Sequence, residues 1–339
     1  SQMAWGQLAQ PAVELSKPAL QAAQVAVVVN ESSPGSLEVG EYYLRARGIP
    51  ARNLVKLRFP ASSRKLSFEE FVSLRDEINR QLDASIEAVV FVWTTPYAVE
   101  CASITGAYTL GIQPEFCAKT CNPSRPSRYC DSRSSRPYQD FGLRLSMLLP
   151  VESVEKAKAL IDRGVLSDFK RPHGKVFLLK TSDVHRNTRA RFFPASVELS
   201  DPPVSIRTIN ADKIEKENDI ILYLTGAVSV PALDTLGFLP GAVADHLTSF
   251  GGDLLGTRQM SSLRWLDAGA TGSYGTVSEP CNHWQKFPNP IVLLKHYLSG
   301  TSLIEAYWRS VAWPMQGLFI GEPLATPYFS RLPVQSAAE

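Results

Sequence analysis

The sequence lacks both a strong net charge and a long apolar run. Its 35 lysines and arginines nearly balance its 33 aspartates and glutamates, which leaves a formal net charge of +2. Nucleic acids and anionic membranes attract strongly basic surfaces, so neither is expected to be the main partner. No apolar stretch approaches the roughly 20 residues that span a bilayer. With 44% hydrophobic residues, the chain has the composition of a globular protein that has no membrane span.

Several motifs of well-known enzyme classes are also missing. The chain contains neither the glycine-rich loops that bind dinucleotides and nucleoside triphosphates nor the H-E-x-x-H helix of zinc peptidases. The G-x-S-x-G turn that exposes a nucleophilic serine is absent as well. A nucleotide cofactor, a zincin-type centre and a serine-hydrolase turn therefore have no support in the sequence.

Short apolar runs alternate with amphipathic segments in the first third of the chain. The runs at 24–30, 53–57 and 87–96 resemble strands that are buried on both faces. Ser67 and Glu70 form a capping-box pattern for a helix from Phe68 to about Leu82. This β-α-β-α-β order indicates parallel strands joined by right-handed crossovers.

The same pattern continues in the second half. Strands are expected at 175–180, 205–209 and 219–226, in the run before Asp245, and at 270–280 and 317–327; helices are expected at 151–169, 260–269 and 289–314. We predict an α/β fold of three layers around a mainly parallel sheet. Residues 24–328 form its single domain, with an N-terminal extension at 1–23 and a C-terminal tail at 329–339.

Residues 112–140 interrupt this rhythm with a long loop that holds four prolines and three of the five cysteines. Loops of this length are usually functional or disordered, so the segment is either a lid pinned by cysteines or a tolerated insertion. In an oxidising compartment, four of the five cysteines would pair as two disulfides and one would keep a free thiol. A metal site is the weaker alternative, because the C-x3-C spacing matches no standard zinc pattern. The five cysteines are Cys101, Cys117, Cys121, Cys130 and Cys281.

Polar residues follow several predicted strands, and ligands of open parallel sheets bind beyond the carboxyl ends of the strands. Cys281 is the candidate nucleophile and His246 its base, because a thiol needs a base to become a thiolate. Glu279 or Asp245 would orient the imidazole. Candidate substrate-binding residues at the same edge are Thr225, Gly226, Ser249, His283 and Cys101.

Three alternatives stay open for these side chains. Cys281 could be bonded to Cys101, because both lie at strand ends. His246 could be a hydrogen-bonded interior histidine. The set of His246, Cys281 and His283 also has donors suited to Zn²⁺ or copper.

Three segments of the second half, together with 25–57, resemble an uncharacterised bacterial family related to gingipain-like and caspase-like cysteine peptidases. They are TGAVSVPALDTLGFLPGAVADHLTSFGG, MSSLRWLDAGATGSYGTVSEPCNHWQKFP and GTSLIEAYWRSVAWPMQGLFIGEPLATPY. The resemblance covers roughly 24–328 and implies a caspase-like sheet with one active edge. It also implies export to the periplasm or secretion, which suits disulfides.

The chain departs from those peptidases at both catalytic positions. They carry His-Gly after one strand and Cys after the next, where this chain has Thr225–Gly226 and Asp245–His246. The catalytic histidine and cysteine of those peptidases therefore cannot be assigned to the matching positions of this chain. The leading hypothesis is an exported hydrolase-like protein with a rearranged Cys/His site that acts on a peptide or amide. The alternatives are a non-catalytic module that binds a peptide, small molecule or partner on a caspase-like scaffold, and a zinc or copper protein.

Overall fold

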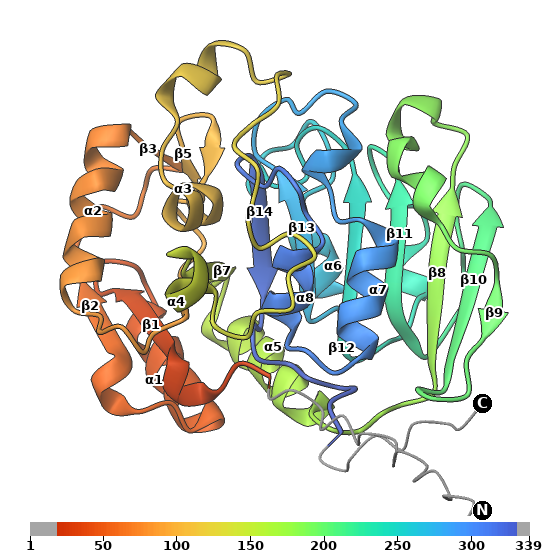
Figure 1. Cartoon of the computed structure of the whole chain (residues 1–339), viewed down its shortest axis with the longest axis horizontal. Coiled ribbons are helices and arrows are strands. Elements are labelled where there is room, and N and C mark those ends of the chain that lie inside the picture. Colours follow the sequence, from red (N-terminus) through yellow and green to blue (C-terminus); the bar gives the residue numbers. More distant parts are fainter. Residues whose placement is uncertain (1–18, 331–339) are drawn as a thin grey trace, which may run out of the picture.

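The computed structural model describes residues 19–330, so most of the expected N-terminal extension and C-terminal tail lie outside the described residues. Within that range, eleven strands form one sheet in the order β2-β1-β4-β7-β14-β13-β12-β11-β8-β10-β9 (Figure 1). The strands are β1 (Val25–Asn30), β2 (Leu54–Leu57), β4 (Ala88–Val92), β7 (Leu145–Leu149), β8 (Gly174–Lys180), β9 (Val197–Glu198), β10 (Val204–Asn210), β11 (Ile220–Gly226), β12 (Phe238–Leu247), β13 (Gly272–Thr276) and β14 (Gly317–Gly321).

Neighbouring strands run parallel, apart from the antiparallel pairs β13–β14 and β10–β9. The prediction of an α/β fold around a mainly parallel sheet is therefore confirmed. A second sheet is small and joins β3 (Lys65–Leu66), β5 (Ala98–Val99) and β6 (Ala102–Ser103).

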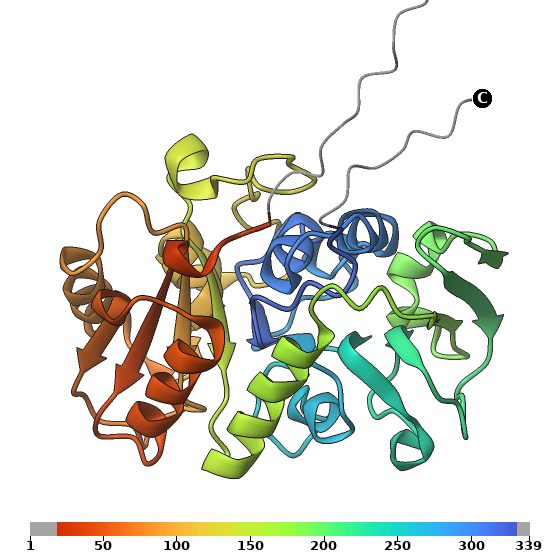
Figure 2. The ribbon, with the colours of Figure 1, turned by 90° about the horizontal axis from the view of Figure 1, so that it is seen from below.

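Helices cover both faces of the large sheet and complete three layers (Figure 2). One face carries α1 (Ser36–Arg47), α5 (Val154–Ser167) and α6 (Leu263–Asp267). The other carries α3 (Ile104–Leu110), α4 (Pro137–Phe141), α7 (Pro290–Leu298) and α8 (Leu303–Arg309). The helix α2 (Phe68–Arg80) lies at the β2 end of the molecule (Figure 1).

Local signals explain where several of these helices begin and end. The capping box predicted for α2 is present, because Ser67 accepts from the Glu70 amide and the Glu70 carboxylate accepts from the Ser67 amide. Helix α1 ends at Gly48, whose φ of 64° lies in the left-handed region that glycine adopts without strain. The strands pack between these helices, and residues 25–29 of β1 are fully buried.

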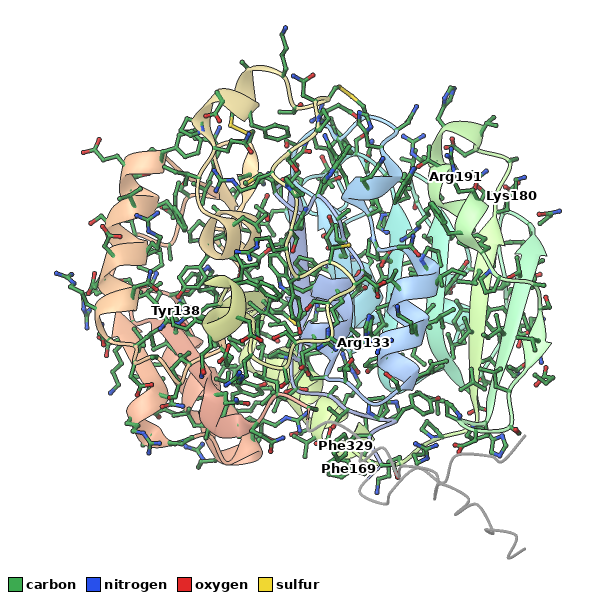
Figure 3. The ribbon with its side chains drawn as sticks, viewed as in Figure 1. Arg133, Tyr138, Phe169, Lys180, Arg191 and Phe329 are labelled. Carbon is green, nitrogen blue, oxygen red and sulfur yellow. A yellow bond between two sulfur atoms is a disulfide. The ribbon has the colours of Figure 1, made fainter. Side chains whose placement is uncertain are left out.

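The strand ends that carry the predicted site residues lie on one side of the molecule. The arrows of β8, β11, β12 and β13 point to the same side of the molecule, and Lys180 and Arg191 are found there (Figures 1 and 3). We call this side the rim. Register places Thr225 of β11 directly opposite His246 of β12. Thr225 and His246, two of the residues predicted for the site, therefore lie side by side at the rim.

Candidate functional site

His246 is an interior residue at the end of β12. It is fully buried, and its Nδ1 accepts a hydrogen bond from the indole N–H of Trp265 at 2.8 Å. Its Nε2 lies 2.9 Å from the carbonyl oxygen of Met260. An indole only donates and a carbonyl only accepts, so the ring is the neutral tautomer with its proton on Nε2. Burial lowers the pKa of His246 to about 4, which keeps the ring neutral at physiological pH.

Asp245 lies beside His246 in sequence but belongs to a different environment, because neighbouring residues of a strand point to opposite faces. Its carboxylate is fully buried, lies 2.6 Å from the guanidinium of Arg189 and accepts from the Tyr307 hydroxyl at 3.1 Å. Burial raises the pKa of Asp245, and the charge of Arg189 opposes that rise. The carboxylate therefore holds Arg189 and does not orient the imidazole.

The end of β11 is covered by the segment that follows β8. A Cβ on Gly226 would lie 2.0 Å from the carbonyl oxygen of Arg186, so the backbone of that residue rests directly on the glycine. The Arg186 side chain donates to the Thr248 hydroxyl at 2.9 Å and to Asp183 at 2.8 Å. Arg189 donates to the carbonyl oxygen of Thr225 at 3.0 Å. The chain itself thus fills the space above Thr225 and Gly226.

Two disulfides pin the long loop to the rim. Cys101 is bonded to Cys117, and Cys121 is bonded to Cys281. The alternative pairing of Cys281 with Cys101 is therefore wrong. The remaining cysteine, Cys130, is free and half-buried. With its sulfur in a disulfide, Cys281 has no thiolate to offer in this structure.

The other predicted residues serve the backbone of the rim. Glu279 accepts from the Cys281 amide at 2.8 Å, and Ser249 accepts at its carbonyl oxygen from the Thr276 hydroxyl at 2.8 Å. His283 bonds the carbonyl oxygen of Cys121 through Nε2 at 2.7 Å, and the Cys101 carbonyl accepts from Ser278 at 2.6 Å.

The side chains proposed for a metal do not gather into a site. Both ring nitrogens of His246 are engaged, the sulfur of Cys281 is bonded to Cys121, and the imidazole of His283 faces a carbonyl. Among residues 19–330, no group of three or more histidine, cysteine or acidic side chains is placed to hold a metal ion. The described rim therefore offers no resident metal position.

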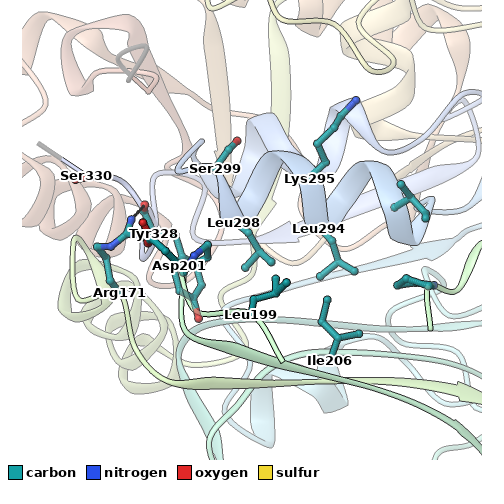
Figure 4. A pocket seen from close by; sticks show the side chains of 13 residues that line it. Arg171, Leu199, Asp201, Ile206, Leu294, Lys295, Leu298, Ser299, Tyr328 and Ser330 are labelled. Atoms are coloured by element: carbon teal, nitrogen blue, oxygen red, sulfur yellow. Dashed lines mark hydrogen bonds and ion pairs between the residues drawn. The ribbon is translucent and has the colours of Figure 1, made fainter. Parts of the chain in front are cut away.

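A separate cavity that the sequence did not indicate lies between α7 and the β9–β10 end of the sheet (Figure 4). Its volume is about 530 Å³, within the range of small-molecule sites. We call it the α7 groove. Its walls are mostly apolar, and one end carries the ion pair of Arg171 with Asp201. The apolar lining residues include Leu199, Ile206, Ile291, Leu294 and Leu298.

The polar groups of the α7 groove already have partners within the protein. Arg171 donates to the Tyr328 carbonyl at 2.9 Å, and the Tyr328 hydroxyl donates to the carbonyl of Pro172 at 3.0 Å. The Lys295 amine, on the upper wall, pairs with Asp131 at 2.5 Å. A ligand of the groove would therefore be held mainly by apolar contact along its length, with a polar group at the Arg171 end.

Comparison with known proteins identifies the fold and no family. No protein-family model matches the chain, and no curated protein matches it. A solved structure titled "Structure of Protease" is similar, with 8% sequence identity and a TM-score of 0.51. The match covers 90% of this chain and 78% of that one. At this identity the likeness shows a protease-like α/β fold and nothing about activity. Within the described residues, no helix is long and apolar enough to cross a membrane.

Proposed function

We propose that the protein is a non-catalytic ligand-binding module built on a protease-like scaffold. Its ligand is the apolar part of a peptide or of an amphipathic small molecule, held in the α7 groove. The observation that carries the proposal is the closed rim: the carbonyl of Arg186 rests on Gly226, and the groups expected to do chemistry are engaged inside the protein.

Unlike the rim, the α7 groove is an open cavity with apolar walls. Leu294 and Leu298 lie one turn apart on α7 and face Ile206 and Leu199 across the cavity (Figure 4). Apolar walls with few polar groups are typical of ligand sites, because burial of apolar surface supplies the affinity and the polar groups fix the orientation. Ile291, at the margin of the groove, remains 48% exposed and offers further apolar surface.

The alternative is a cysteine hydrolase that uses Cys281 and His246 on a peptide or amide. It requires a reduced Cys281 and a histidine whose nitrogen is free to accept a proton. The disulfide with Cys121 and the bonds of His246 to Trp265 and Met260 weigh against it. If the wild type cleaves members of a peptide library and Cys281→Ala does not, the result would favour the hydrolase over the binding module.

The test uses 8-anilinonaphthalene-1-sulfonate, an apolar dye with one anionic group, titrated by fluorescence. We expect Ile291→Glu to weaken binding about tenfold, because loss of apolar contact and an added charge cost about 1.4 kcal/mol or more. Leu255→Glu is the matched control: Leu255 is 41% exposed and does not line the groove. Equal loss in both variants, or none in Ile291→Glu, would exclude the α7 groove as the site.

We also propose that the protein works outside the cytoplasm. Two disulfides suit an oxidising compartment such as the periplasm or the extracellular space, because cytosolic thiols are kept reduced. Fractionation of the source cells tests this: recovery of the disulfide-bonded chain in the cytosol would contradict it.

A further inference from the structure

The two disulfides of the rim differ in their exposure. Cys101 and Cys117 are both half-buried, whereas Cys121 is exposed and its partner Cys281 is half-buried. Exchange begins when a thiolate attacks one sulfur of a disulfide, so access to that sulfur controls the rate. Cys121 is the one exposed residue among these four cysteines, which makes its disulfide the expected first point of attack by a reagent in solution.

Side-chain donors hold the backbone on the loop side of the second disulfide. The amine of Lys286 donates to the carbonyl of Thr120 at 2.6 Å, and His283 bonds the carbonyl of Cys121 at 2.7 Å. Lys286 is fully buried, and its amine also lies over the ring of Phe116. These two donors therefore fix the backbone of Thr120 and Cys121 next to the disulfide.

Hydrogen bonds hold the segments around Cys121 and Cys281 in place independently of the sulfur–sulfur bond. The Glu279 carboxylate holds the amide of Cys281, and Gln316 donates to the carbonyl of Glu279 at 2.8 Å. On the loop side, Lys286 and His283 hold the carbonyls of Thr120 and Cys121. Cleavage of this disulfide therefore leaves the local backbone anchored on both sides.

We propose that Cys121–Cys281 is a reversible redox site that exchanges with dithiols, whereas Cys101–Cys117 is structural. The thiolate of a dithiol reductant attacks the sulfur of Cys121, and Cys281 leaves as a thiolate. The second thiol of the reductant then attacks the mixed disulfide, releases Cys121 as a thiolate and closes the reductant into its own disulfide. Two electrons pass to the protein, and Cys281 becomes a free thiol in the loop that follows β13.

The experiment is a graded reduction of the native full-length chain with dithiothreitol, followed by alkylation and peptide mass spectrometry. A Cys130→Ser background removes the free thiol, so that disulfides cannot reshuffle through it. We expect Cys121–Cys281 to be half reduced at a dithiothreitol concentration at least about tenfold below that for Cys101–Cys117. The circular dichroism spectrum should remain native at that point, and oxidised glutathione should restore the bond.

Three results would overturn the proposal. They are reduction of both disulfides over the same concentration range, earlier reduction of Cys101–Cys117, and unfolding of the chain when Cys121–Cys281 opens. The outcome is independent of the α7 groove, because dye binding there is measured on the oxidised protein.

Discussion

The neutral, buried state of His246 makes a quantitative prediction about stability. In the folded protein the imidazole takes up a proton only near pH 4, whereas a solvated histidine does so near 6.5. Between these values the unfolded chain binds more protons than the folded one, so the free energy of unfolding falls as the pH falls. The stability is fully present above about pH 6.5 and is lost progressively toward pH 4.

The size of the loss follows from the two pKa values. At about 1.4 kcal/mol for each unit of pKa difference, His246 accounts for about 3 kcal/mol between pH 7 and pH 4. The full figure applies because the ring is fully buried and solvent does not screen its charge. In His246→Gln, the amide still offers an acceptor to Trp265 and a donor to Met260 but does not titrate.

The assay is urea unfolding of the wild type and His246→Gln at several pH values from 7 to 4. Other groups titrate in both proteins, so the quantity of interest is the difference between their free energies of unfolding. We expect the advantage of the wild type to shrink by about 3 kcal/mol over this range. A difference that does not change with pH, or an imidazole NMR resonance that titrates near 6.5, would refute the assignment of His246 as a neutral interior residue.

Two further predictions concern the closed rim. Arg189→Met leaves the Asp245 carboxylate buried without its partner and should lower the free energy of unfolding by about 3–5 kcal/mol. The double variant Arg189→Met/Asp245→Leu should recover most of this loss. A loss below about 1 kcal/mol in the single variant would contradict the buried ion pair. Gly226→Ala places a methyl group against the carbonyl of Arg186 and should cost about 1–3 kcal/mol in thermal or urea unfolding; a neutral result would mean that this backbone is not packed on β11.

The parts of the fold that could be predicted are those with local signals. The apolar run of β1 and the capping box of α2 each specify the local structure within a few residues. The strand β7 and the helix α3 carry no such local signal. All seven residues of α3 are buried, so it has no amphipathic period, and β7 follows the long loop with no preceding helix pattern. The boundary of the single domain at 24–328 stays a prediction.

The surroundings of the site residues were harder to predict, because they are formed by segments that are distant in the sequence. The sequence placed Asp245 and His246 correctly at the end of a strand, but it could not show that Arg186 and Arg189 fold over that end. The α7 groove combines a helix with the β9–β10 end of the sheet, and neither segment carries a motif. A cysteine that follows a strand can be a nucleophile or half of a disulfide, and its sequence position alone does not distinguish the two.

A map of the five cysteines in the purified, non-reduced chain tests the central claim most directly. Alkylation under denaturing, non-reducing conditions should label Cys130, and peptide mapping should recover Cys101 joined to Cys117 and Cys121 joined to Cys281. A free Cys281 that reacts with iodoacetamide in the native protein at a pH-dependent rate would contradict the account and return the hydrolase to first place.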